Sequence, residues 1–339
     1  MRSNNVLGFI FAATLDDKIP ELASSRTTAS VPIGGKYRII DFDLSNMSNS
    51  GISNVGIVAK SNFQSLMDHV GSGSAYDLSK RRSNLSILPP YDGKAFSSFV
   101  ETIYNMHGYI EHCREEYVLI SQGNVITNID YTDVFDFHSK KKADITLIYK
   151  NHAIPQGYDR PITLDVDNDG KVNQIFVKPG VVDKGVFNHA YGSILIKKDL
   201  LMSEIRNAIS VNQLDVRRLI QSSLGKYSIY AYENKGYCAA ISSINDYFEF
   251  NMDLMKKEVR DELFNPQRPI YTKVRDDAPS RYGLTSNVKN SIIAQGCVIN
   301  GDVENCVISK GVYVGEGAKL SNCIVMQDTK IGCNTNLNY

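Results

Sequence analysis

One stretch of sequence decides how the fold is interpreted: Val31-Pro32-Ile33-Gly34-Gly35-Lys36-Tyr37-Arg38-Ile39-Ile40-Asp41-Phe42-Asp43-Leu44-Ser45-Asn46. It joins a pair of glycines to a mostly apolar segment that runs toward Gly51. We expect Asp41 or Ser45 to cap a short helix here, because side-chain oxygens accept hydrogen bonds from the first free N–H groups of a helix. Gly51 is expected to end that helix.

On both sides of this stretch, up to about residue 245, short apolar runs alternate with segments of helical spacing. The strand-like runs are Val6–Ala13, Val55–Ala59, Tyr117–Ser121 and Ile145–Tyr149. The helical patterns are Phe63–Val70, Val100–His112 and Asp133–Lys140. Such alternation predicts an α/β domain with a mainly parallel sheet between helices, and a site at the carboxyl ends of the strands.

Residues 165–170 begin like a calcium-binding loop, with Asp165, Asp167 and Asp169 followed by Gly170. The twelfth position of such a loop, which should supply a bidentate glutamate, is Phe176. A hairpin turn at residues 168–170, between the strands Ile162–Asp165 and Val172–Val177, is therefore the favoured interpretation.

Composition changes near the end of the chain. A helical segment, Ile244–Phe264, leads into the linker Asn265–Ser280, after which three similar repeats contain Asn290, Asn305 and Asn322. The repeat length of about one coil predicts a β-solenoid with the aliphatic side chains inside and the three asparagines in a ladder. We predict three segments: residues 1–245, residues 246–285 as helix and linker, and residues 286–339 as the solenoid.

Charge and cysteine content exclude several classes of protein. Thirty-seven basic and 37 acidic residues give a net charge of zero, which argues against a nucleic-acid partner. No run approaches the roughly 18 apolar residues of a membrane span, so no membrane association is expected. Six cysteines without a C-x-x-C pair are expected to be reduced core residues of a cytoplasmic protein. The six histidines show no metal-ligand spacing.

The P-x-G-G-K-Y-R-I-I-D-F-x-L-S-N run, followed by Ser50-Gly51-Ile52, resembles bacterial ADP-glucose pyrophosphorylase, also called glucose-1-phosphate adenylyltransferase. The resemblance extends from about Val6 to the last residues. It implies a Rossmann-like nucleotidyltransferase domain followed by a short left-handed β-helix of hexapeptide-type repeats. It also implies adenylyl transfer from ATP to glucose 1-phosphate, assisted by Mg²⁺.

The positions that should hold the triphosphate are replaced. The family's glycine-rich G-G-x-G-x-R loop corresponds to residues 13–18, where Asp16 and Asp17 stand in place of residues that cradle phosphate. Two like charges 5 Å apart cost roughly 3 kcal/mol at an effective dielectric constant of 20. The alternative is a rebuilt loop in which both carboxylates face water. Thr28 takes the place of a phosphate-binding lysine.

The metal and sugar positions are replaced as well. Both carboxylates that the resemblance assigns to Mg²⁺ are absent, since Asn124 and Ala240 occupy their positions. Val177 replaces the acid expected to bind sugar hydroxyls, whereas Lys178 of the substrate-like pocket is kept. These losses predict no catalytic residues, no metal site and no cofactor, because Mg²⁺ needs hard oxygen ligands.

We therefore predict a regulatory, catalytically degenerate subunit of glucose-1-phosphate adenylyltransferase that acts with a catalytic homologue in ADP-glucose and glycogen biosynthesis. The expected assembly is a hetero-tetramer, or a homo-oligomer when the chain is alone. A weakly active enzyme that uses Lys178, with or without Lys18, stays open as an alternative. So does a sugar-phosphate or anion-sensing module. An acyltransferase of the hexapeptide class is disfavoured because residues after 285 contain no histidine.

A phosphorylated metabolite is a further candidate ligand. The resemblance places an effector site at cationic residues between the two domains, and Arg26 lies beside that region. The candidate anion-binding residues are Arg26, Lys36, Arg81 and Arg82. The alternative for the basic run Lys80-Arg81-Arg82 is a solvated loop.

Overall fold

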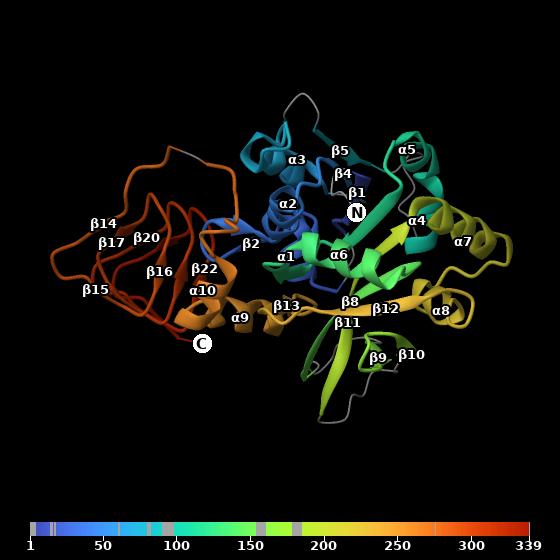
Figure 1. Ribbon diagram of the computed structural model, residues 1–339. Helices are drawn as coiled ribbons and strands as arrows, with labels where there is room; N and C mark the ends of the chain where they lie inside the picture. Colours follow the sequence, from blue (N-terminus) through green and yellow to red (C-terminus); the bar gives the residue numbers. More distant parts are fainter. Residues whose placement is uncertain are drawn as a thin grey trace.

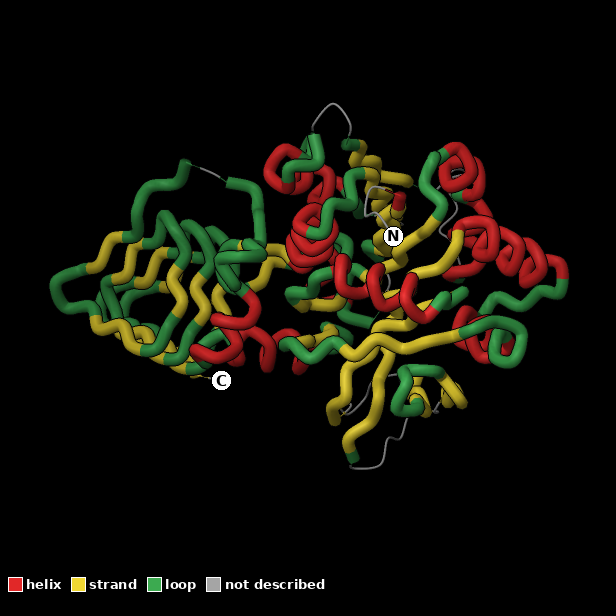
Figure 2. The backbone as a smooth tube through the Cα atoms, in the orientation of Figure 1, coloured by secondary structure: helices red, strands yellow, loops and turns green. Residues whose placement is uncertain are grey.

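The computed structural model describes residues 5–13, 16, 18–59, 62–79, 83–89, 98–153, 161–177, 185–274 and 276–338. Figure 1 shows an α/β domain that contains most of the chain and a β-helix built by its carboxyl-terminal part. Helices surround the strands of the first domain, whereas the second consists of short strands and turns (Figure 2). Within the described ranges, no helix is both long and apolar enough to cross a bilayer.

The α/β domain is built on a nine-stranded mixed sheet with the order β10-β9-β11-β6-β1-β4-β5, in which β8 pairs with both β11 and β12. The central strands β6, β1, β4 and β5 are parallel, as the alternating pattern predicted, whereas β11 is antiparallel to β6, β8 and β9. The strands are β1 (Val6–Phe11), β4 (Asn54–Val58), β5 (Asn84–Leu88), β6 (Tyr117–Gln122), β8 (Ile145–Ala153), β9 (Ile162–Val166), β10 (Val172–Val177), β11 (Val186–Lys197) and β12 (Ile229–Glu233).

Helices cover both faces of this sheet. Alternate residues of β1 point to opposite faces, so its apolar side chains contribute to a core on each side. Leu7 and Phe9 belong to the core formed with α4, α5 and α7, and Val6 and Ile10 to the core formed with α2, α3 and α6. The helices of the first face are α4 (Phe99–Asn105), α5 (His107–His112) and α7 (Lys198–Ser210). Those of the second are α2 (Ile39–Asn49), α3 (Gln64–Val70) and α6 (Tyr131–Lys141).

The remaining helices of the described α/β part are α1 (Pro20–Ala23), α8 (Val216–Ser222), α9 (Ile244–Asp253) and α10 (Lys257–Leu263), with a 3₁₀ helix at Thr28–Ser30 and another at Ser74–Tyr76. Two short sheets complete the domain: β2 (Pro32–Ile33) with β3 (Tyr37–Arg38), and β7 (Val125–Thr127) with β13 (Cys238–Ala240).

The expected cap of α2 is wrong in detail. The helix begins at Ile39 with Arg38 as its N-cap, so Asp41 lies in the first turn and accepts a hydrogen bond from the Arg38 N–H at 2.9 Å. Neither Asp41 nor Ser45 precedes the helix. The expected end is confirmed, since Gly51 follows the helix with a φ of +76°, which favours glycine.

The hairpin between β9 and β10 is confirmed. The Asp167 carboxylate accepts hydrogen bonds from the N–H groups of Asp169 and Lys171, and Gly170 has a φ of +85°. The expectation for the cysteines holds in part. All six are free thiols, and Cys297 and Cys306 are buried, but Cys333 is exposed.

The solenoid is confirmed as three parallel sheets of short strands that form successive coils. Its strands are β14 (Arg281–Tyr282), β15 (Asn287–Lys289), β16 (Ile292–Ile293), β17 (Val298–Ile299), β18 (Asp302–Glu304), β19 (Val307–Ile308), β20 (Tyr313–Val314), β21 (Lys319–Ser321), β22 (Ile324–Val325), β23 (Lys330–Ile331) and β24 (Asn336–Asn338). The predicted ladder is present: the Asn290 amide donates to Asn305 at 2.7 Å, and Asn305 donates to Asn322 at 3.3 Å. All three asparagines have positive φ, which this residue tolerates at a tight corner.

The glycine pair of the opening stretch lies at the junction of the two domains. Gly34 and Gly35 form the turn between β2 and β3, with φ values of +55° and +80°. A Cβ atom on Gly35 would lie 3.2 Å from the carbonyl oxygen of Ile308 in the β-helix, so this turn packs directly against a coil. An apolar cluster extends the contact from α9 to side chains of the β-helix, among them Ile292, Ile324 and Met326.

Candidate functional site

Three chain segments meet at the carboxyl ends of β1 and β6. The Gly123 N–H donates to the Phe11 carbonyl at 2.8 Å, and the Ala29 N–H donates to the Ala12 carbonyl at 3.1 Å. A Cβ atom on Gly123 would lie 2.9 Å from both Ala29 Cβ and the Phe11 oxygen, so glycine permits this close approach. The meeting point is where a parallel sheet places a ligand site.

Two of the positions where the resemblance leads us to expect phosphate-binding residues contact each other here. The carboxylate of Asp16 accepts hydrogen bonds from the backbone N–H and the hydroxyl of Thr28, both at 2.7 Å. Thr28 is buried and Asp16 is half-buried. Asp16 is thus bonded within the protein and does not simply face water, and it uses donors at the start of the 3₁₀ helix. Lys18 is exposed, and Asp17 lies outside the described residues.

The two positions expected to hold metal ligands also lie side by side. β7 and β13 are antiparallel, with Ala240 opposite Val125, and the Asn124 side-chain amide donates to the Ile241 carbonyl at 3.2 Å. The buried Asn124 Oδ1 has no hydrogen-bond partner among the described residues. Ala240 packs with Val125, Tyr191 and Cys238.

This donor set does not fit a magnesium ion. An amide and a methyl group occupy the two positions where hard oxygen ligands would be needed. Burial raises the pKa of the Cys238 thiol to about 12, so it stays neutral. The part of the chain that the structure describes contains no group of three or more His, Cys, Asp or Glu side chains able to hold a metal.

A neutral histidine pair lies next to this apolar cluster, and sequence reasoning missed it. The hydroxyl of Tyr191 is hydrogen-bonded to His152 Nε2, which lies 3.3 Å from His189 Nδ1. Burial lowers the pKa of His189 to about 3, and burial also lowers the pKa of His152. Residues 152 and 189 are far apart in the sequence and belong to no common motif. Only the pairing of β8 with β11 brings them together.

A buried carboxylate lies behind the site. Asp43 of α2 accepts a hydrogen bond from the hydroxyl of Ser121, near the end of β6, at 2.5 Å. Burial raises the pKa of Asp43 from 3.8 to about 7, although the hydrogen bond from Ser121 opposes the shift. Between pH 3.8 and about 7, Asp43 therefore keeps a proton in the native protein that it has released in the unfolded chain.

Keeping this proton stabilises the native protein. We predict that its contribution to the free energy of unfolding is present in full below pH 3.8 and is lost as the pH rises through about 7. From pH 5 to pH 7 the wild type should lose about 2 kcal/mol of unfolding free energy relative to Asp43→Asn, which cannot titrate. Urea unfolding of both proteins at several pH values measures this difference. The exposed Asp136→Asn variant serves as control and should follow the wild type. A difference that stays constant with pH would contradict the prediction.

The other predicted residues are spread over the domain. Val177 ends β10 and pairs with Ile162 of β9, so two strand spacings, about 10 Å, separate it from β11. Arg26 follows α1, near enough to Tyr247 of α9 for its charge to offset part of the rise in pKa that burial gives that phenol. Lys36 is exposed, with its ammonium 4.8 Å from the centre of the Tyr37 ring. Lys80, Arg81, Arg82 and Lys178 lie outside the described residues.

The first domain is an α/β sheet with a ligand position at the carboxyl ends of its strands, which is typical of nucleotidyltransferases. The parallel coils that follow it form a hexapeptide-type β-helix. Comparison with protein-family models agrees: "Nucleotidyl transferase" matches residues 17–257, and "GlmU-like, C-terminal hexapeptide" matches residues 273–339.

Similar proteins extend over nearly the whole chain. The glycogen biosynthesis protein GlgD of Geobacillus stearothermophilus is 37% identical over 326 residues, which is 93% of this chain and 83% of that protein. GlgD of Bacillus subtilis is 32% identical over 324 residues, 94% of this chain and 84% of the relative. The glucose-1-phosphate adenylyltransferase of Clostridium perfringens strain SM101 is 32% identical over 343 residues, 98% and 87% respectively. The chain belongs to the ADP-glucose pyrophosphorylase family.

Proposed function

We propose that this chain is a regulatory, catalytically degenerate subunit of glucose-1-phosphate adenylyltransferase, acting in the cytoplasm with a catalytic homologue in ADP-glucose and glycogen biosynthesis. One observation carries the proposal. Asn124 directly precedes β7, and Ala240 lies opposite Val125 in the paired strand β13, so the positions where two carboxylates would hold Mg²⁺ offer one amide and a buried methyl group. Without the ion, the charge that develops on a reacting polyphosphate lacks its main stabilisation.

The phosphate side of the site supports the same function. A triphosphate would have to compete with the Asp16 carboxylate for the N–H and hydroxyl of Thr28, and it would be repelled by that carboxylate. Since each tenfold loss of rate corresponds to about 1.4 kcal/mol, the loss of the ion and of a cationic side chain together lowers turnover by many decades.

The framework, in contrast, is kept. The glycine turn of the opening stretch still docks on the β-helix, and the Gly34 N–H donates to the Asn251 side chain of α9 at 3.0 Å. A subunit that acts through contacts needs this rigid junction but needs no reacting groups. Two of the relatives are named glycogen biosynthesis protein GlgD, whereas others are named glucose-1-phosphate adenylyltransferase.

The test measures ADP-glucose formation by the full-length chain, by its catalytic homologue and by a mixture of the two. We expect no turnover by this chain alone and a severalfold change in kcat or in substrate affinity for the mixture. Serum albumin at the same concentration replaces the chain as control. The proposal is wrong if the mixture equals the catalytic homologue alone, or if this chain alone releases pyrophosphate from ATP and Lys178→Ala abolishes the release.

A further inference from the structure

A large groove lies outside the site described above. It runs along α6 and is bounded by the end of β12, the turn between β9 and β10, and the loop that precedes β13. Its volume is about 670 Å³, and a neighbouring cavity of about 270 Å³ shares Asn128, Gly236 and Arg268 with it. Volumes of this size are typical of small-molecule sites. Asp16, Thr28, Asn124 and Ala240 do not line either cavity.

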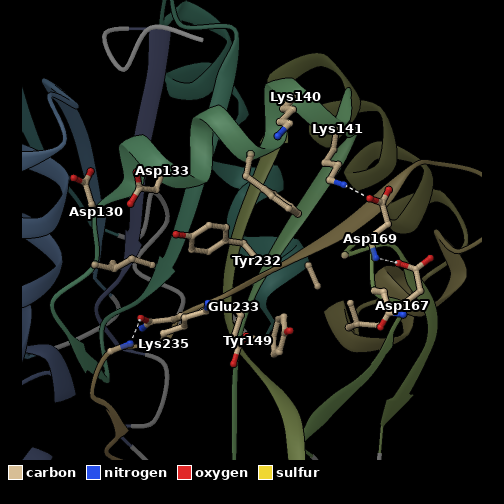
Figure 3. A pocket seen from close by; sticks show the side chains of 18 of the residues that line it. Asp130, Asp133, Lys140, Lys141, Tyr149, Asp167, Asp169, Tyr232, Glu233 and Lys235 are labelled. Carbon is tan, nitrogen blue, oxygen red and sulfur yellow. Dashed lines mark hydrogen bonds and ion pairs between the residues drawn. The ribbon is translucent and has the colours of Figure 1, made fainter.

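The charges around the groove nearly cancel. Its lining includes five carboxylates, Asp130, Asp133, Asp167, Asp169 and Glu233, and four cations, Lys140, Lys141, Lys235 and Arg268. Figure 3 shows Asp130 and Asp133 on one side and Asp167 and Asp169 on the other, where Lys141 reaches Asp169 at 2.5 Å. A strongly anionic ligand would meet carboxylates at both ends, and a strongly cationic ligand would meet the four cations of the lining, whereas a neutral ligand would meet many hydrogen-bonding groups.

Aromatic rings supply flat apolar surfaces between these polar groups. Tyr232 and Tyr149 lie in the middle of the groove (Figure 3), and the Phe137 ring packs edge-on against Tyr232 at 5.6 Å. All three residues are half-buried, so part of each remains accessible. A half-exposed tyrosine combines a flat ring with a polar hydroxyl, which suits ligands that have both apolar faces and hydroxyl groups.

A buried amide adds an independent indication of a ligand. Asn128 is 7% exposed, and its side-chain nitrogen donates to the carbonyls of Leu263 and Arg268 at 2.8 and 2.9 Å. Its Oδ1 has no hydrogen-bond partner among the described residues. A buried acceptor without a partner is costly, and Asn128 borders both cavities, so a small rotation of its side chain would let a ligand hydroxyl donate to Oδ1.

We infer that this groove binds a neutral oligosaccharide. The C–H faces of pyranose rings would pack on Tyr232 and Tyr149, while their hydroxyls would donate to the carboxylates and to Asn128 and accept from the lysines. The near balance of charge disfavours a nucleotide, a sugar phosphate or a polyamine in the same place.

The test is calorimetric titration of the full-length chain with maltotetraose and cellotetraose as neutral probes, and with inorganic phosphate and spermidine as charged probes. At least one tetrasaccharide should bind, and Tyr232→Ala should weaken that binding at least tenfold. Tyr232→Phe, which keeps the ring, should weaken it two- to threefold. Melting curves confirm that each variant is folded.

A second variant tests the inference independently, in case Tyr232→Ala does not fold. Asp133 is exposed at the rim of the groove, and Asp133→Lys should weaken tetrasaccharide binding about tenfold because it removes an acceptor and places a long side chain across the opening. Asp136→Lys makes the same change on the exposed face of the same helix, away from the groove, and should bind like the wild type. The inference is overturned if neither tetrasaccharide binds, if only phosphate or spermidine binds, or if Asp133→Lys and Asp136→Lys bind alike.

Discussion

Replacing Asp41 with alanine is expected to lower the free energy of unfolding by about 3–5 kcal/mol. The carboxylate is fully buried and lies 2.6 Å from both His69 Nε2 and the Tyr76 hydroxyl. It also accepts the Arg38 N–H, so one side chain holds together the start of α2, α3 and the 3₁₀ helix at Ser74–Tyr76. Alanine would leave a buried imidazole and a buried phenol without their acceptor, and an unpaired buried polar group costs more than its hydrogen bond contributes.

Urea unfolding of the full-length chain measures this loss. Asp68→Ala is the matched control, because Asp68 lies on the exposed face of α3, and it should change the free energy by no more than about 0.5 kcal/mol. Tyr76→Phe removes a single hydrogen bond and should cost about 1–2 kcal/mol. A loss of less than about 1 kcal/mol in Asp41→Ala would contradict the prediction. It would mean that water or a local rearrangement supplies new hydrogen-bond partners to His69 and Tyr76.

The double variant Asn124→Asp, Ala240→Asp is expected to acquire a response to divalent cations that we do not expect of the wild type. Both positions are buried, so without an ion the two new carboxylates should lower stability by about 3–5 kcal/mol, because a buried charge without a partner is costly. An ion that binds only the native state restores about 2.7 kcal/mol when its concentration is 100 times its dissociation constant.

Thermal unfolding with and without Mg²⁺ or Mn²⁺ measures this effect. The single variant Asn124→Asp is the control, since one carboxylate beside a methyl group should bind the ion weakly. ADP-glucose formation should remain undetectable in the double variant, because the Asp16 carboxylate still occupies the N–H and hydroxyl of Thr28. An equal rise in melting temperature for the wild type would show that it already binds the ion, and the proposed loss of the metal site would be wrong.

Much of the fold could be predicted from local pattern. Alternating apolar runs located β1, β4, β6 and β8, and the repeats located the β-helix and its asparagine ladder. Local sequence pattern failed to predict the structure where tertiary contacts determine it. The predicted helix Val100–His112 is divided into α4 and α5 at Met106, and the segment Ile244–Phe264 is divided into α9 and α10. β11 is antiparallel to β6, β8 and β9, and these long-range pairings are not visible in any local pattern.

The sequence by itself determined which chemical groups are present: Asn124 and Ala240 cannot supply two carboxylates in any fold. Only the tertiary structure decided which groups meet. The Asp16–Thr28 contact spans 12 residues, the Asn124–Ile241 contact spans 117, and the groove along α6 collects residues from 128 to 268. Residue identity is a local property that is read directly, whereas contacts between distant residues follow from strand pairing and packing, which no single segment encodes.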